Sequence, residues 1–279
     1  MSRPVPLAMN PLVVSPLQLR VARVLGHSQS DYGDAFAAVG LRLDGGTALA
    51  SYYLGHRESD DLDFFGTPAM HSADVAATMS ALLEHEGFDI VHGGGNNAGY
   101  ASIVVRGEGG RVDRPLKLDV CRASSFSFES VRATVEGIPV ASYRDVCAGK
   151  MHALCDRYEP RDFVDLHSIL LRASADSPPP AAHSRRVRLR ELIQDLCQAD
   201  PGLSALEVAK ALERGRDKPL VSGLPHRLLV PLTDGDVQTV IATAADEARA
   251  VAAEDLGRSI ATQYPEREQP VPPAKPSEL

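Results

Sequence analysis

Hydrophobic and polar residues follow two different periods in the first half of the chain. Apolar positions recur at helical spacing in 16–27, 47–56 and 72–86, and the last of these has Ser72 where an N-cap would stand and Gly87 where a C′ glycine belongs. Shorter runs with strand-like patterns lie between and after these segments, in 41–44, 61–65, 88–93, 100–107 and 115–123. This order predicts an α/β (α+β) fold, with helices packed on a mixed sheet.

The pattern becomes wholly helical after about residue 140. Helices are predicted for 143–157, 161–173, 185–198, 201–214 and 236–256. Prolines and small polar residues mark 173–184 as a linker, and the proline-rich end of the chain predicts a disordered tail. We therefore expect an α/β core over 1–141, a helical lobe over 142–264 and a tail over 265–279.

Composition and charge narrow the class of protein. The chain has 279 residues, with 29 Lys and Arg against 37 Asp and Glu, so its formal net charge is −8. No apolar run is long enough to cross a membrane, and the first residues lack the apolar core of a secretory signal, so a cytoplasmic protein is expected. The four cysteines show no zinc-binding spacing and are expected to be reduced thiols.

Three carboxylates stand out in the predicted strands. Asp61 and Asp63 are two positions apart, so their side chains project from one face while Leu62 and Phe64 project from the other. Asp119 lies on the polar side of a later strand. If the two strands are neighbours, the three carboxylates converge, and Mg²⁺ is the cation that such oxygen ligands favour.

A glycine turn precedes these carboxylates. Gly45, Gly46 and Thr47 come directly before a predicted helix, where backbone N–H groups and a hydroxyl would be free to bind an anion. The later run HGGGNNAG, residues 92–99, lies between two predicted strands and lacks the P-loop pattern, so a flexible hairpin connection is favoured there.

The ordered set of motifs resembles a known superfamily. GGTALASYYLGHRESDDLDFF is similar to the signature of the DNA polymerase β-like nucleotidyltransferases, and more specifically to the AbiEii/AbiGii toxin family. The likeness continues through residues 137–170 and covers about residues 40 to 172. The spacer of fourteen residues between Gly46 and Asp61 is slightly longer than is typical of the superfamily.

This resemblance implies roles for further residues. It implies a polymerase β-like core, catalytic Asp61, Asp63, Asp119, Lys150 and Asp165, and Mg²⁺ or Mn²⁺ held by the first three. It implies nucleotide contacts from Gly45, Gly46, Thr47, Ser59, Lys150 and Arg157, with Asp162 orienting its neighbours. The likeness also implies an NTP substrate, an RNA acceptor such as tRNA and a separate antitoxin chain.

The residues alone also allow plainer interpretations. Arg161 and Asp165 have the spacing of an ordinary helix ion pair. Arg185, Arg186, Arg188 and Arg190 form either a solvated face or a contact for a nucleic-acid backbone. A small-molecule nucleotidyltransferase of the antibiotic-modifying kind, or a non-catalytic NTP-binding module, would use the same carboxylates.

Overall fold

The computed structural model describes most of the chain. The described residues are 5–28, 31–106, 114–123, 126–157, 159–174, 189–216 and 219–263. The predicted linker, except for its first two residues, and the predicted tail lie outside these ranges, as do Arg185, Arg186 and Arg188. No helix among the described residues is long and apolar enough to span a membrane.

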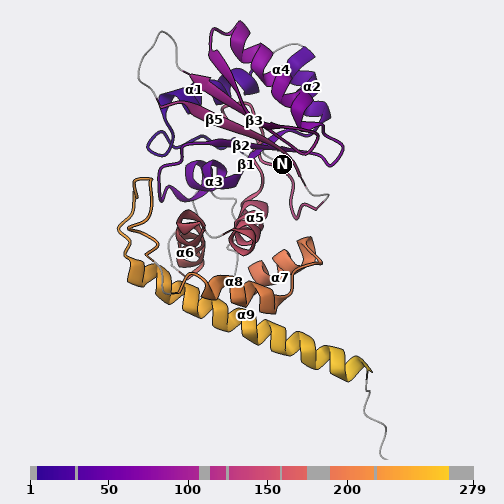
Figure 1. The fold of residues 1–279 in the computed structure, drawn as a ribbon, viewed down its shortest axis with the longest axis vertical. Helices are drawn as coiled ribbons and strands as arrows, with labels where there is room; N and C mark the ends of the chain where they lie inside the picture. The colour runs from indigo at the N-terminus through magenta and orange to yellow at the C-terminus, as the bar shows by residue number, and fades with distance from the viewer. Residues whose placement is uncertain are drawn as a thin grey trace, which may run out of the picture.

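A five-stranded mixed sheet forms the centre of the N-terminal part (Figure 1). Its strands are β1 (Arg42–Asp44), β2 (Leu62–Gly66), β3 (Asp89–Asn96), β4 (Tyr100–Arg106) and β5 (Leu116–Arg122). They are arranged in the order β1-β2-β5-β4-β3, with β2 and β5 parallel and the other neighbours antiparallel. The predicted mixed sheet is confirmed, and the two strands that carry the predicted carboxylates are neighbours.

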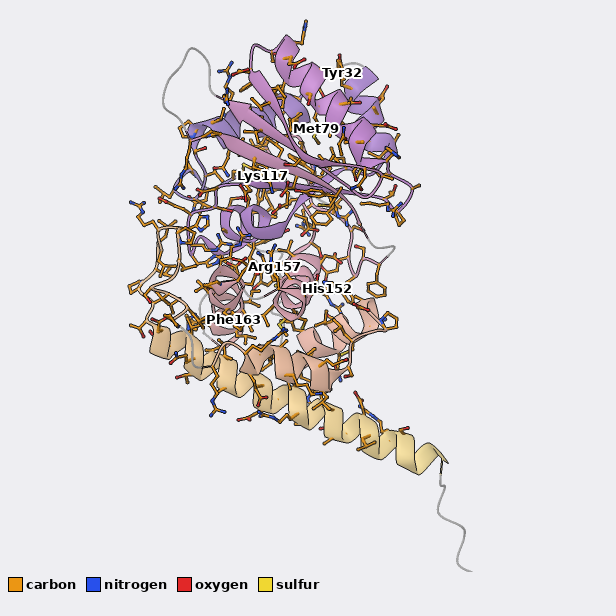
Figure 2. All side chains as sticks on the ribbon, viewed as in Figure 1. Tyr32, Met79, Lys117, His152, Arg157 and Phe163 are labelled. Carbon is orange, nitrogen blue, oxygen red and sulfur yellow. The ribbon has the colours of Figure 1, made fainter. Side chains whose placement is uncertain are left out.

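The helices before and within the sheet divide between its two sides. They are α1 (Pro16–Gly26), α2 (Asp31–Ala38), α3 (Gly45–Ala48), the π-helix η1 (Leu49–Leu54) and α4 (Ser72–His85). In Figure 1, α2 and α4 lie on one side of the sheet and α3 lies on the other. Helix α4 packs on β3, β4 and β5, and Figure 2 labels Met79, which has no exposed surface, in this layer.

The two sides of the sheet differ in polarity because side chains alternate along each strand. The side facing α4 is apolar and buried, with Leu62, Phe64, Ile103, Leu118 and Val120 each at most 1% exposed. The opposite side carries Asp63 and Asp119. The hydrophobic effect therefore fixes which way the carboxylates point, since a one-residue shift of register would bury them in the core.

The remaining helices form the part of the molecule below the sheet in Figure 1. They are α5 (Tyr143–Asp156), α6 (Pro160–Ser174), α7 (Leu189–Ala199), α8 (Ala205–Glu213) and α9 (Asp234–Gln263). Residues 139–141 pair with Leu43 of β1 just before α5 begins, which places α5 beside the sheet and against α3. The division into lobes after residue 141 stays a prediction.

Several local expectations need correction. Ser72 is the first helical residue of α4 and not its N-cap; His71 occupies that position and makes no capping bond with its side chain. The predicted turn at Gly45 and Gly46 is instead the start of α3, and the glycines at 93–95 belong to β3, with a register shift between His92 and Asn96. Gly87 does have the positive φ of a C′ residue, at 85°.

Candidate functional site

Four polar residues form a row across the open side of the sheet. Asp44 is paired with Asp63, Asp63 with Asp119, and Asp119 with Ser102, each on the neighbouring strand. Asp61 lies just before β2 and two positions from Asp63. The structure therefore places Asp63 and Asp119 side by side on neighbouring strands, with Asp61 two positions before Asp63, and it adds Asp44, which was not predicted from the sequence.

Three carboxylates at this site, those of Asp44, Asp61 and Asp63, have raised pKa values. Burial raises the pKa of Asp63, and the negative charges of Asp119 and Asp61 raise it further, against the opposing charge of Lys150. Burial also raises the pKa of Asp61. The pKa of Asp44 is raised to about 6, again mainly by burial. Desolvation and mutual repulsion thus disfavour the ionised carboxylates, and the cations nearby do not fully compensate.

Asp119 already has two donors on the protein. Its Oδ1 accepts a hydrogen bond from the Tyr100 hydroxyl at 2.8 Å, and its Oδ2 contacts the Lys117 ammonium at 2.7 Å. Lys117, labelled in Figure 2, is 43% exposed, so its ammonium has room to move away into solvent. Its charge is also the largest that opposes the raised pKa of Asp61. Lys117 therefore supplies some of the positive charge that the row lacks.

The side chains of the row have the chemistry of a divalent-cation site, but their positions are not those of a complete one. The donors are carboxylate oxygens, and their raised pKa values show that added positive charge would stabilise them. Within the described ranges, however, no three His, Cys, Asp or Glu side chains are grouped closely enough to hold a metal ion. One oxygen of Asp119 is instead in contact with Lys117.

The two glycines at the start of α3 are required for close approach to this row. Gly45 has a φ of +70°, and a Cβ there would lie 2.1 Å from Oδ2 of Asp63. The Gly46 N–H donates a hydrogen bond to the same carboxylate. A Cβ at Gly46 would instead lie 3.0 Å from a guanidinium nitrogen of Arg57 and 3.4 Å from Nζ of Lys150. The start of α3 thus lies between the carboxylates and a group of cations.

Thr47 ties the start of α3 to the segment that leads into β2. Its hydroxyl is 2.7 Å from the hydroxyl of Ser59 and also contacts the backbone oxygen of Asp61. Both side chains are buried, Thr47 at 1% exposure and Ser59 at 8%. Gly46, Thr47 and Ser59 are therefore adjacent, as expected of residues proposed to bind one ligand.

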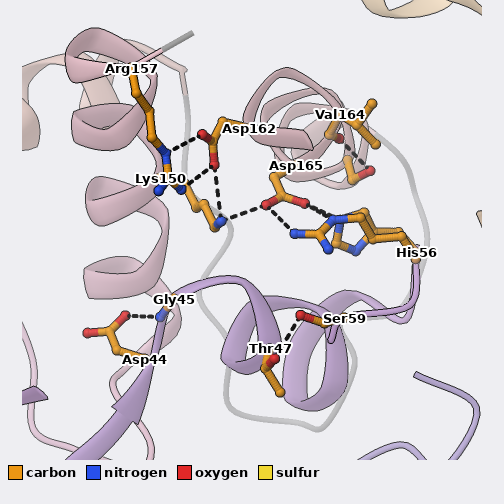
Figure 3. Close-up of polar contacts among 12 residues, drawn as sticks. Asp44, Gly45, Thr47, His56, Ser59, Lys150, Arg157, Asp162, Val164 and Asp165 are labelled. Carbon is orange, nitrogen blue, oxygen red and sulfur yellow. Dashed lines mark hydrogen bonds and ion pairs between the residues drawn. The ribbon is translucent and has the colours of Figure 1, made fainter. Parts of the chain in front are cut away.

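A buried ion cluster joins this segment to α5 and α6 (Figure 3). Asp165 of α6 has no exposed side-chain surface and accepts a bidentate pair from Arg57, at 2.7 and 2.9 Å. It also lies 2.8 Å from Nζ of Lys150 and 2.7 Å from Nε2 of His56. Burial alone would raise the pKa of Asp165, but the charges of Arg57 and Lys150 outweigh it and hold that pKa well below the ordinary value.

Asp162 forms the second half of the cluster. It contacts Nζ of Lys150 at 3.3 Å and receives two hydrogen bonds from Arg157, at 3.0 and 3.3 Å. Lys150, Arg157, Asp162 and Asp165 are thus brought together, with Lys150 shared between the two carboxylates. Of these, Lys150 is 5% exposed, whereas the side chain of Arg157 is about half exposed.

Two members of this cluster were not predicted from the sequence, and the alternative partner of a third, Asp165, is not found. Arg57 and His56 lie in the connection between η1 and β2, where no periodicity indicates a buried side chain. The one sequence signal for Arg57 is its place in the motif, two positions before Ser59. The alternative interpretation, an ion pair between Arg161 and Asp165, is not observed, because Arg57, Lys150 and His56 occupy both oxygens of Asp165. Tertiary contacts override the helical spacing here.

Arg190 is the one described member of the predicted arginine cluster. Its guanidinium contacts Glu247 at 2.7 Å and Glu254 at 2.7 and 2.9 Å, and both glutamates belong to α9. Arg190 therefore attaches α7 to α9. All four cysteines are free thiols, as expected.

Comparison with known proteins identifies the family. The family model of the AbiEii toxin, a nucleotidyl transferase of type IV toxin–antitoxin systems, matches residues 23–256. None of the curated protein sequences compared with the chain matches it.

Solved structures provide distant likenesses. JHP933 from Helicobacter pylori has a TM-score of 0.46 and 15% identity, over 90% of this chain and 96% of that one. MenT4, a nucleotidyltransferase toxin from Mycobacterium tuberculosis H37Rv, has a TM-score of 0.46 and 18% identity, over 88% of this chain and 90% of that one. A putative nucleotidyltransferase from H. pylori has the same TM-score and identity as MenT4, over 87% of this chain and 95% of its own.

The family model covers most of the chain, including the carboxylate row, the start of α3 and the buried ion cluster. The chain is therefore a member of the AbiEii family, the nucleotidyltransferase toxins of type IV toxin–antitoxin systems.

Proposed function

We propose that the protein transfers a nucleoside monophosphate from an NTP to a hydroxyl group of an RNA, with tRNA as the expected class of acceptor. The observation that carries this proposal is the pairing of Asp63 with Asp119 in register on parallel strands, with Asp61 beside them and Lys150 close enough to act on Asp63. Carboxylates on neighbouring strands are the oxygen ligands by which a phosphoryl-transfer site holds Mg²⁺.

Asp61, Asp63 and Asp119 would hold Mg²⁺ or Mn²⁺. The cation supplies positive charge where the attacking and leaving oxygens gain negative charge. Before it binds, Lys117 occupies one oxygen of Asp119. The role of Lys117 is then to stabilise the empty row, since its exposed side chain can give up this contact to a cation.

The triphosphate would bind around the start of α3. Gly45 and Gly46 let the backbone lie close to Asp63, Arg57 and Lys150, and Thr47 and Ser59 offer hydroxyl groups beside them. Lys150 and Arg157 supply positive charge, and Asp162 and Asp165 hold Lys150 in place. Asp165 acts as a positioning residue in this arrangement, because its oxygens already have partners on the protein.

The reaction is a substitution at the α-phosphorus of the NTP. The acceptor oxygen forms a bond to that phosphorus, and the bond from phosphorus to the bridging oxygen of the β-phosphate breaks. Pyrophosphate leaves with the bonding electrons, and the proton of the acceptor hydroxyl passes to water. Lys150, at 5% exposure, stabilises the negative charge of the triphosphate in a site with little water.

The toxin family implies an antitoxin. We propose that it is a separate chain. Growth inhibition by the active enzyme would then depend on how much of this second chain the cell makes.

The test is incubation of the purified protein with each α-labelled NTP and total RNA. We expect one NTP to label RNA, with release of pyrophosphate, and Asp61→Ala to reduce labelling by at least a thousandfold without loss of fold. Asp89→Ala, which removes an exposed carboxylate from β3, is the matched control and should label RNA normally.

Other outcomes of this assay would replace the proposal. Label found in added aminoglycosides but not in RNA would indicate a small-molecule nucleotidyltransferase. NTP binding with no pyrophosphate release under any condition would indicate a non-catalytic module. Unchanged activity of Asp61→Ala would overturn the assignment of the carboxylates.

A further inference from the structure

Arg161 is a cation beside the carboxylate row that has no partner among the described residues. It follows Pro160 at the start of α6 and is partly buried. Its Nε is buried and makes no hydrogen bond. Both carboxylates of the same helix are taken, Asp165 by Arg57 and Lys150 and Asp162 by Lys150 and Arg157. A buried N–H donor left in this state indicates a missing acceptor.

His226 is a second incompletely paired group near the same place. Its side chain is 7% exposed, and its Nε2 lies 3.3 Å from Oδ2 of Asp60. The segment around it is fixed, because the Leu229 N–H donates to the His56 oxygen at 2.9 Å and the Glu58 N–H donates to the Arg227 oxygen at 2.9 Å. His226 is therefore held beside the residues that lead into β2.

The free nitrogen of His226 is an acceptor. A carboxylate such as Asp60 only accepts, so Nε2 must carry the proton in this contact. Burial lowers the pKa of His226, which favours the neutral ring. Nδ1 then has a lone pair, and it is buried without a hydrogen-bond partner. Arg161 thus offers a donor and His226 an acceptor, both unused.

These two groups lie near Asp61, just before β2, whereas Lys150 lies near Asp63. Arg161 lowers the pKa of Asp61 and also acts on His226. Lys150 is the largest opposing charge at Asp63. The other charges that face His226 are those of Asp60, Asp61 and Arg57, and Arg114 is paired with Asp60 at 2.7 Å. Arg161 therefore acts on Asp61, beside Lys117, while Lys150 acts on Asp63.

We propose that Arg161 and His226 form a ribose–phosphate subsite for the acceptor strand, with a phosphate oxygen on Arg161 and a ribose hydroxyl on Nδ1 of His226. The subsite rests on the proposed function, in which the NTP binds near Lys150 and the start of α3. An anionic oxygen satisfies the guanidinium, and a hydroxyl proton satisfies the imidazole lone pair. A 2′-hydroxyl contact would also distinguish RNA from DNA.

The test is equilibrium binding of a fluorescein-labelled single-stranded RNA of about 12 nucleotides, and of DNA with the same sequence, measured by anisotropy with Mg²⁺ present. We expect Arg161→Gln to weaken RNA binding about tenfold or more, as the loss of a charge-assisted hydrogen bond would. We expect His226→Phe to bring the affinity for RNA down to that for DNA. Thermal unfolding should show that both variants fold.

Arg227→Gln is the matched control. Arg227 is the neighbour of His226, but it is 68% exposed and already paired with Glu58 at 3.1 Å, so its loss should change RNA affinity by less than twofold. Dialysis against each labelled NTP should give wild-type binding for all three variants. Because these are binding measurements, they do not depend on turnover, and failure of the labelling assay above is a separate result.

The proposal is overturned if Arg161→Gln binds RNA as the wild type does, or if the wild type binds neither strand. It is also overturned if the variant loses NTP binding while RNA binding is kept, since Arg161 would then belong to the nucleotide. Equal weakening by Arg161→Gln and Arg227→Gln would show a general charge effect and no subsite.

Discussion

The carboxylate row and the buried ion cluster use the same residue type in opposite ways. In the row, Asp44, Asp61 and Asp63 have raised pKa values, because burial and mutual repulsion outweigh the cations nearby. In the cluster, Asp165 is more deeply buried, yet its pKa is held well below the ordinary value by Arg57 and Lys150. Burial alone therefore does not decide the charge state of a carboxylate.

The contrast indicates a division of roles. In the cluster, both carboxylates are paired with cations of the chain, and these ion pairs fasten α5 and α6 to the segment that precedes β2. The row is incomplete and gains stability from any cation that enters. A site that must bind a cation and release it needs an environment like that of the row. The neighbouring cluster keeps the segment before β2 in place.

The largest expected effect comes from breaking the cluster. Asp165→Ala would leave Arg57 and Lys150 buried with one partner fewer each, and removing one side of a buried pair typically costs about 3–5 kcal/mol. We expect a loss of this size in the free energy of unfolding, measured with urea. Asp74→Ala, an exposed carboxylate of α4, is the control and should cost less than about 0.5 kcal/mol. Equal stability of the two variants would refute the structural role of the cluster.

Breaking the row should have the opposite effect on stability. Asp63→Asn keeps an acceptor for the Gly46 N–H and removes a charge that is repelled by Asp61 and Asp119. We expect activity to fall by at least a hundredfold while the free energy of unfolding stays the same or rises by about 1 kcal/mol. Millimolar Mg²⁺ should raise the melting temperature of the wild type and not of this variant. A marked loss of stability would show that the row is not short of positive charge.

The pH dependence of stability sharpens the comparison further. The pKa of Asp44 is about 6 in the folded protein and near 3.8 when unfolded, so the folded state binds the extra proton between these values. Ionised Asp44 therefore costs stability above pH 6, at most about 3 kcal/mol, and this cost disappears as the pH falls toward 4.

We expect Asp44→Asn to be more stable than the wild type at pH 7 and equal to it near pH 4, since asparagine also caps α3 well. Urea unfolding of both proteins across this range gives the difference directly, and other titrating groups cancel. Asp165 behaves in the opposite sense, because its contribution is present above pH 3.8 and is lost only at lower pH. A difference that does not change between pH 7 and pH 4 would contradict the raised pKa of Asp44.

The smallest expected effect is at the junction of the two regions. Thr47→Val keeps the shape of the side chain and removes its contacts with Ser59 and with the Asp61 backbone. We expect a loss of about 1–2 kcal/mol in the free energy of unfolding. Thr78→Val, whose hydroxyl bonds only within the exposed face of α4, is the control. If the two variants lose equal free energy of unfolding, the contacts of Thr47 contribute no more to stability than an exposed helix hydroxyl does.

Residue patterns predicted the row better than the cluster, for a physical reason. Alternation along β2 and β5 places Asp63 and Asp119 on the polar face, because their neighbours Leu62, Phe64 and Leu118 must be buried. The same alternation holds in β1, where Leu43 is buried and Asp44 shares the polar face, so Asp44 was within reach of the same reasoning.

The cluster depends on contacts that no local pattern contains. Arg57 and Asp165 are 108 positions apart, and their pairing is decided by how α6 packs on η1. The alternative pair of Arg161 with Asp165 is not observed for this reason. The N-cap at Ser72 failed in a similar way, since that side chain is buried at the first position of α4 and makes no hydrogen bond there. Lys150 and Asp162 were placed together only through the family resemblance.

The backbone bonds between residues 56–58 and 227–229 have a consequence for synthesis of the protein. A chain emerging from the ribosome carries the carboxylates of β2 and β5 early, but the segment that supports His56 and Glu58 follows more than a hundred residues after β5. The neighbourhood of Asp61 is therefore assembled only after residues 227–229 have been made. For an enzyme that acts against its own cell, this order delays activity until the helical part that follows the sheet has been made.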